Sequence, residues 1–156
     1  MDKRILMTVA GYERLNNELE KLKSVDRLAV AAAMEEGHSY GYASPELLDV
    51  RDRQMFLEGR IWELEQLLPR AQLIDPKTLS GNKVVFGATV DVSDFGTGKK
   101  LTYQIVGQLE ADLEKGRLSH ISPLAKALLG KSKGNVVEVQ TRKGTEKYKI
   151  MAIRFV

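Results

Sequence analysis

The sequence predicts an α+β protein in which an N-terminal antiparallel coiled-coil hairpin precedes an antiparallel β domain with one short helix. Two observations predict this class. Apolar residues first recur every three or four positions, and after a break at 75–82 they alternate in short runs. The break contains Asp-Pro and Ser-Gly-Asn, which are typical of turns. We therefore divide the 156 residues into a hairpin domain, 1–75, and a β domain, 76–156.

Charge separates the same two parts of the chain. The first 75 residues hold ten basic and fourteen acidic residues, a net charge of −4, whereas residues 76–156 hold fourteen basic and seven acidic residues, a net charge of +7. A basic domain is suited to bind an acidic protein surface or nucleic acid. An ordinary solvated surface, however, gives similar counts of charged residues.

A first helix is predicted from Thr8 to Gly37. Thr8 is a suitable N-cap, and Glu13 precedes Lys21 along the helix, as the helix dipole favours. The apolar residues at helical spacing form one stripe: Leu15, Leu19, Leu22, Val25, Leu28 and Ala32.

A second helix is predicted to begin at Pro45, with Ser44 as the N-cap and Glu46 as favourable early charge, and to be disturbed at Pro69. Its expected seam consists of apolar residues seven positions apart, which are Leu48, Met55 and Trp62. Other apolar residues widen the seam: Leu47, Phe56, Ile61, Leu64, Leu67 and Leu68.

Each helix of about 25 to 30 residues is roughly 40 Å long. Because nothing else in this half covers the two apolar stripes, the helices are expected to pack as an antiparallel hairpin with its tip at 37–45. Such an arm suits a protein that reaches into a deep site on a partner. A dimerisation hairpin is the alternative that the pattern leaves open.

Strands are predicted at 84–86, 88–92, 101–106, 136–141 and 147–155, separated by glycine-containing turns. One helix interrupts them at 123–129, with Ser122 as the N-cap and Gly130 as the stop. The pattern indicates a small antiparallel β domain.

Several classes of chemistry are excluded. The chain has no cysteine, and its two histidines, His38 and His120, fall in different predicted domains without ligand spacing. The segment 96–98, Gly-Thr-Gly, precedes a strand instead of a helix, which favours a hairpin turn over a phosphate loop. We expect no enzyme activity of its own, no catalytic residue, no metal and no cofactor.

A membrane location is also not expected. No apolar run approaches the roughly 18 to 20 residues that cross a bilayer. The stretch at the start of the sequence is too short to be the apolar region of a signal peptide. We expect a cytoplasmic protein without a membrane partner.

Four motifs resemble those of a known family. Residues 8–15, Thr-Val-Ala-Gly-Tyr-Glu-Arg-Leu, together with Glu18, Leu19 and Leu22, resemble its opening helix, and 58–61, Glu-Gly-Arg-Ile, resemble its second-helix signature. Residues 86–88, Phe-Gly-Ala, resemble a strand of its C-terminal domain, and 122–131, Ser-Pro-Leu-Ala-Lys-Ala-Leu-Leu-Gly-Lys, its C-terminal helix. In this order, from Thr8 to the C-terminus, the chain resembles the bacterial Gre (GreA/GreB-like) transcription elongation factors.

The resemblance implies a partner, bacterial RNA polymerase. The hairpin of such factors enters the secondary channel, near the 3′ end of the nascent RNA, and a C-terminal domain of FKBP-like fold binds the channel rim. An Asp-x-x-Glu pair at the tip helps to hold a second magnesium ion for cleavage of backtracked RNA. Carboxylates suit this task because magnesium prefers oxygen ligands.

This sequence departs from the family at that pair. Alignment from 58–61 puts Tyr40 and Ala43 at the two acidic positions, and alignment from Thr8 puts Tyr42 and Pro45 there. With either choice, residues 37–45 contain no Asp or Glu. A neutral phenol, an alanine or a proline cannot bind magnesium as a carboxylate does.

The sequence therefore predicts a monomeric polymerase-binding elongation regulator that does not stimulate cleavage, and that modulates elongation or competes with cleavage factors. One alternative is a conventional cleavage factor that uses displaced acids: Glu35, Glu36, Glu46 or Asp49. Another, a prolyl isomerase or chaperone, rests only on analogy with the FKBP-like fold.

The remaining candidate site residues come from three regions. At the tip, His38, Tyr40, Tyr42 and Ala43 contact RNA, polymerase or one another. Four arginines form either a basic patch that faces RNA or solvated, ion-paired helix positions: Arg27, Arg51, Arg53 and Arg60. Ser122 and Pro123 match the region that meets the polymerase rim, and they also make a good helix start.

Overall fold

The computed structural model describes residues 3–38 and 44–156. The chain forms two compact units. The first comprises Met1–Lys3 and Tyr12–Ala71, and the second comprises Arg4–Gly11 and Gln72–Val156. The observed boundary lies after Ala71, four residues before the expected division after residue 75, and the N-terminal segment Arg4–Gly11 packs within the second unit.

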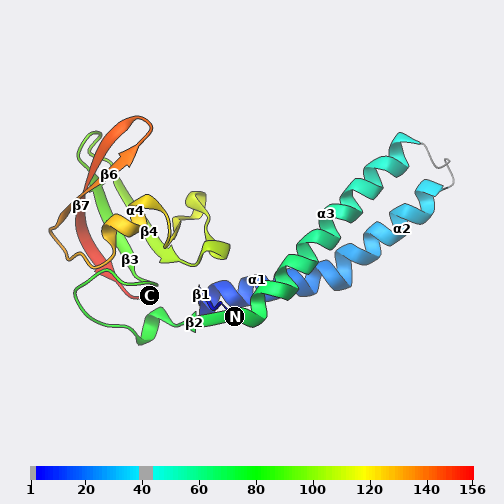
Figure 1. The fold of residues 1–156 in the computed structure, drawn as a ribbon, viewed down its shortest axis with the longest axis horizontal. Coiled ribbons are helices and arrows are strands. Elements are labelled where there is room, and N and C mark those ends of the chain that lie inside the picture. The colour runs from blue at the N-terminus through cyan, green and yellow to red at the C-terminus, as the bar shows by residue number, and fades with distance from the viewer. Residues whose placement is uncertain (1–2, 39–43) are drawn as a thin grey trace. The chain divides into compact units, whose positions relative to one another are not determined.

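The helical hairpin follows the capping signals in the sequence (Figure 1). One arm consists of α1 (Val9–Lys21), a π-helical segment (Leu22–Asp26) and α2 (Arg27–His38), and the other arm is α3 (Pro45–Leu67). The hydroxyl of Ser44 accepts a hydrogen bond from the backbone N–H of Leu47 at 3.2 Å, which makes Ser44 the N-cap of α3. Thr8 caps α1 in the same way by accepting from the N–H of Gly11 at 3.0 Å.

The seam of α3 is not the one predicted. The heptad residues Leu48, Met55 and Trp62 face solvent, with Met55 75% and Trp62 66% exposed. The buried residues lie on another face of the helix: Leu47, Val50, Leu57, Ile61 and Leu64. Three of the residues expected only to widen the seam, namely Leu47, Ile61 and Leu64, therefore form it.

In the first arm, the predicted apolar stripe is also partly wrong, and the π-helical segment explains why. A π turn holds one residue more than an α turn, so it shifts the phase of the apolar stripe by about 100°. Leu15 is buried as predicted, but Val25 within the π-helical segment and Leu28 beyond it are exposed. Gly37 is buried instead, and a Cβ there would approach Leu47 Cδ1 to 3.0 Å.

The second unit is built on a mixed five-stranded sheet with the order β5-β4-β3-β7-β6. Its strands are β3 (Thr89–Asp94), β4 (Lys100–Val106), β5 (Arg117–Ser119), β6 (Val136–Thr141) and β7 (Gly144–Arg154). β4 and β5 are parallel, and every other pair in this sheet is antiparallel. The short strands β1 (Ile5–Thr8) and β2 (Ala71–Ile74) form a separate two-stranded sheet.

Four of the five predicted strands are confirmed, the one at 136–141 with the predicted ends and the other three with shifted ends. The strand predicted at 84–86 is wrong. Val84 is buried, but the region forms no strand: it has an isolated bridge between Lys83 and Ser132, and the carbonyl of Val84 accepts from the N–H of Gly130. The sequence pattern missed β1, β2 and β5 because strands of three or four residues are too short to show alternation.

The core of the second unit lies between the sheet and α4 (Pro123–Leu128). Ser122 caps α4 by accepting from the N–H of Ala125 at 3.3 Å, and Gly130 follows the helix with a φ of 82°. The core residues include Val90, Ile105, Leu118, Leu128 and Ile150. The α+β class, with a helical hairpin followed by a sheet and one short helix, is confirmed.

Within the described parts of the chain, no helix is both long enough and apolar enough to cross a bilayer.

Candidate functional site

The tip of the hairpin is described only up to its edges. His38 is the last residue of α2 and is exposed. Tyr40, Tyr42 and Ala43 lie outside the described residues. By sequence, residues 37–45 contain no Asp or Glu.

The acids nearest the tip lie on the helices. Glu35 and Glu36 are exposed residues near the end of α2. Glu46 is in the first turn of α3, where a negative charge is favoured by the helix dipole. Asp49 forms an ion pair with Arg53, with 3.4 Å between Oδ2 and Nε.

Three of the four candidate arginines are ion-paired within the hairpin. Arg27 donates to both carboxylate oxygens of Glu58 at 2.9 and 2.7 Å, and this contact lowers the pKa of Glu58. Arg60 donates to both oxygens of Glu18 at 2.8 and 3.0 Å, which raises the pKa of Arg60. Paired arginines present less net positive charge to an RNA than free ones.

Arg51 is the exception among the four. It is partly buried on α3, and among the described residues it makes no ion pair. The structure therefore does not bring the four arginines together as one positively charged cluster.

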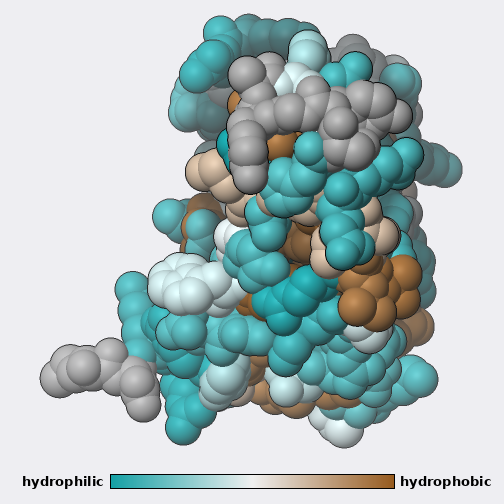
Figure 2. All heavy atoms as spheres, turned by 90° about the vertical axis from the view of Figure 1, so that its right-hand side faces the viewer, coloured by the Kyte–Doolittle hydropathy of each residue, from teal (hydrophilic) through white to brown (hydrophobic). Residues whose placement is uncertain are grey.

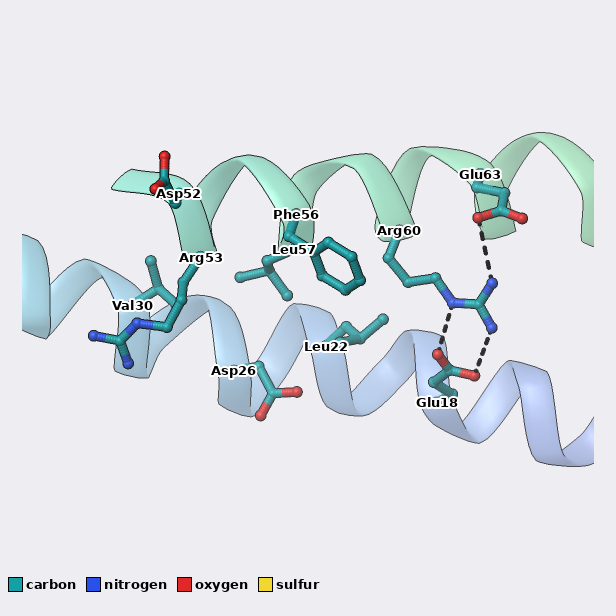
Figure 3. Close-up of a pocket in the computed structure, with 10 residues that line it drawn as sticks. All are labelled: Glu18, Leu22, Asp26, Val30, Asp52, Arg53, Phe56, Leu57, Arg60 and Glu63. Atoms are coloured by element: carbon teal, nitrogen blue, oxygen red, sulfur yellow. Dashed lines mark hydrogen bonds and ion pairs between the residues drawn. The ribbon is translucent and has the colours of Figure 1, made fainter. Parts of the chain in front are cut away.

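A groove with a volume of about 700 Å³ runs between the two arms of the hairpin. Leu22 and Val30 from the first arm and Phe56 and Leu57 from α3 form its apolar part, and Figure 3 shows these side chains between the two helices. The bidentate pair of Arg60 with Glu18 closes one end. Neither the groove nor Phe56 was singled out as a site from the sequence.

Ser122 and Pro123 border a second cavity of about 670 Å³, which lies entirely in the second unit. Its wall includes Leu118 and the aromatic rings of Tyr103 and Tyr148. The hydroxyl of Tyr148 donates to Glu146 Oε2 at 2.6 Å, and this hydrogen bond raises the pKa of Tyr148. An apolar cavity beside a helix start can accept a side chain from a partner.

A buried carboxylate was also missed in the sequence. Glu110 is only 6% exposed, and it accepts hydrogen bonds from the backbone N–H groups of Thr8 and Gly107 at 3.0 and 2.8 Å. The only local sequence feature of Glu110 is that it lies three residues after Gly107. This spacing is too common to mark Glu110 as a buried carboxylate. Across the described part of the chain, no three His, Cys, Asp or Glu side chains gather as a metal-binding group.

Comparison with known families gives matches to both units. The model described as "Transcription elongation factor, N-terminal" matches residues 5–73, and that described as "Transcription elongation factor, GreA/GreB, C-term" matches residues 79–155. Together they cover nearly the whole chain.

Individual relatives agree with these models. The chain is 50% identical over 153 residues to transcription elongation factor GreA of Thioalkalivibrio sulfidiphilus, covering 96% of this chain and 97% of the relative. It is 48% identical to GreA of Paracoccus denitrificans over 155 residues, covering 98% and 99%. Among solved structures, GreA factor homolog 1 of Thermus thermophilus is 31% identical, with 97% and 99% covered and a TM-score of 0.43. From the two family matches and the full-length identities, the chain belongs to the GreA/GreB family of transcription elongation factors.

Proposed function

We propose that this elongation factor binds bacterial RNA polymerase as a monomer, with its hairpin in the secondary channel, and regulates elongation without stimulating transcript cleavage. The observation that carries the proposal is the absence of Asp and Glu from residues 37–45 in a chain that otherwise keeps the family's two parts. The hairpin then occupies the channel near the RNA 3′ end and competes there with cleavage factors.

The chemistry of the tip supports this assignment. Two-metal cleavage of a phosphodiester needs the second ion fixed beside the attacking water, and magnesium is held by carboxylate oxygens. The available tip side chains are histidine, serine and tyrosine, which are weak or neutral ligands at pH 7. The two nearby acids have structural roles that do not require a metal. Glu46 suits the N-terminus of a helix, and Asp49 is paired with Arg53.

The second unit supplies the proposed contact with the channel rim. Ser122 and Pro123 lie at the border of the apolar cavity described above, and Ile121 beside them is 45% exposed. A partner loop that covers this border buries apolar surface without disturbing the sheet. Such a contact anchors the factor while the hairpin reaches the channel.

A conventional cleavage factor that uses a displaced acid is the second candidate. It is favoured by the 50% identity to a relative named GreA and by the exposure of Glu46 in the first turn of α3. A Glu46→Gln variant keeps the size of the side chain and removes the charge. On this second assignment the variant loses cleavage activity, and on the proposed assignment there is no activity to lose.

The direct test uses elongation complexes that have been backtracked on a defined template with labelled RNA. The protein is added alone and together with a known cleavage factor, and RNA shortening is followed over time. We expect no shortening beyond the intrinsic rate when the protein is alone, and slower shortening when it competes with the cleavage factor. Strong stimulation by the protein alone would refute the proposal.

A further inference from the structure

The groove between the arms of the hairpin coincides with the π-helical segment. Leu22 and Asp26, the first and last residues of that segment, both line the groove. Insertions of this kind reposition side chains and occur frequently at functional sites. Here the insertion turns Val25 to solvent and leaves Asp26 on the groove side.

The apolar part of the groove is poorly covered by the protein itself. Phe56 is 82% exposed although its ring borders the cavity, and Leu57 beneath it is buried. Figure 3 shows the ring of Phe56 beside Leu57, facing the space above Leu22. An exposed aromatic ring next to an apolar cavity is typical of the residues that dominate binding at protein interfaces.

The polar lining of the groove has an excess of negative charge. It holds four carboxylates and only two guanidinium groups. Glu18 and Glu63 are paired with Arg60, and Arg53 is paired with Asp49 outside the groove. Among the described residues the carboxylates of Asp26 and Asp52 make no ion pair or hydrogen bond, so their charge is available to a partner.

We propose that this groove, defined by Leu22, Asp26, Val30, Asp52, Phe56 and Leu57, binds a protein segment of RNA polymerase that presents an apolar side chain next to a lysine or arginine. The apolar side chain fills the cavity beside Phe56, and the cation lies near Asp26 and Asp52. The negative charge disfavours a nucleic-acid backbone as the occupant. This inference rests on the proposed binding to polymerase, and it adds a contact on the side of the hairpin to those at the tip and rim.

The test compares two neighbouring exposed residues of α3, of which only one borders the groove. Phe56 borders the groove, whereas Met55 faces solvent outside it. The full-length protein carries a fluorescent label, and its affinity for core RNA polymerase is titrated for the wild type, Phe56→Ser, Asp26→Asn and the control Met55→Ser. Far-UV circular dichroism checks that each variant keeps its helices.

We expect Phe56→Ser to weaken binding about tenfold, as loss of a central aromatic contact does. Asp26→Asn weakens it by roughly threefold at low salt and by less at high salt, because screening reduces the lost attraction. Met55→Ser leaves the affinity within about twofold of the wild type, as expected for a residue outside the contact.

The outcomes separate this inference from the proposed function. If the wild type binds polymerase and Phe56→Ser binds equally well, the groove proposal is overturned and the proposed function stands. If the wild type does not bind, the proposed function fails, and the groove proposal fails with it. A photocrosslinker at position 56 that joins two copies of this chain, or RNA, instead of a polymerase subunit also overturns the groove proposal.

Discussion

The carboxylate of Glu110 is bonded twice to Thr8, a residue 102 positions earlier in the chain. Oε2 accepts from the backbone N–H of Thr8 at 3.0 Å, and Oε1 accepts from the Thr8 hydroxyl. That hydroxyl in turn accepts from the N–H of Gly11 at 3.0 Å and caps α1. A single buried carboxylate thus orients the N-cap that starts the first helix, and this network lies entirely within the second unit.

Replacing this carboxylate should destabilise the second unit. In Glu110→Gln one oxygen becomes an NH₂ group, which cannot accept from Thr8 or Gly107, so at least one buried donor is left without a partner. The expected loss in the free energy of unfolding is about 2 kcal/mol, measured by urea denaturation. The exposed neighbour Glu114 provides the control, since Glu114→Gln should change stability by less than about 0.5 kcal/mol. Equal stability of the two variants would contradict the structural role of Glu110.

Two helical glycines should respond oppositely to alanine. A Cβ at Gly11 would lie 1.8 Å from Glu110 Oε1, so Gly11→Ala must displace the bonded carboxylate and should lower stability. A Cβ at Gly59 meets no atom within 4 Å, so Gly59→Ala should raise stability by up to about 1 kcal/mol through helix propensity. Thermal unfolding of both variants measures the difference. A stabilising Gly11→Ala would show that the contact with Glu110 is not tight.

A cross-strand ion pair should make the stability of the protein depend on pH. Asp91 accepts from Arg154 and from the hydroxyl of Thr102, the latter at 2.7 Å, and these bonds lower its pKa, with Arg154 contributing most. Because the pKa of Asp91 is lowered in the folded protein, the ion pair stabilises the fold at pH values above the ordinary aspartate pKa. This stabilisation is lost as the pH falls from that value through the lowered pKa of the folded state. Because Arg154 is partly exposed, the contribution at pH 7 and low salt is about 0.5 to 1 kcal/mol.

The measurement compares the wild type with Asp91→Asn by urea denaturation at neutral pH and at about pH 3, below the ordinary aspartate pKa. The wild type should be the more stable at neutral pH, and the difference should shrink in acid. A difference that is independent of pH would mean that packing, and not the charge of Asp91, stabilises this position.

Restoring acids at the tip should create cleavage activity. On the alignment from residues 58–61, the double variant Tyr40→Asp, Ala43→Glu returns two carboxylates to the family's positions. The expected result is RNA shortening in backtracked complexes above that of the wild type, because magnesium gains oxygen ligands. The matched control is Tyr40→Asn, Ala43→Gln, which keeps similar shapes without charge. Equal activity of the two double variants would argue against a metal-binding effect.

Ser122 can be tested separately as a helix cap and as a contact. Ser122→Asp should keep α4 stable, since aspartate is an equally good N-cap, whereas Ser122→Ala should cost about 1 kcal/mol. If the rim of the polymerase contacts this position, Ser122→Asp should weaken binding to core polymerase despite its normal stability. Normal affinity of Ser122→Asp would leave the residue with the capping role alone.

The sequence by itself determined the features that depend on neighbouring residues. Ser44, Thr8 and Ser122 were identified as N-caps because a cap and its partner are only three residues apart. The class of the fold followed from the change in apolar periodicity, and the absence of acids at 37–45 is a property of the sequence alone.

Only the tertiary structure decided which face of each helix is buried and what Glu110 does. The π-helical segment rotates everything after Leu22 by about 100°, so residues such as Leu28 that continue the early stripe become exposed. Met55 and Trp62 likewise fit a heptad, but packing buries Leu57 and Ile61. A phase shift within a helix and a bond across 102 residues leave no local pattern, because both depend on contacts that form only when the chain has folded.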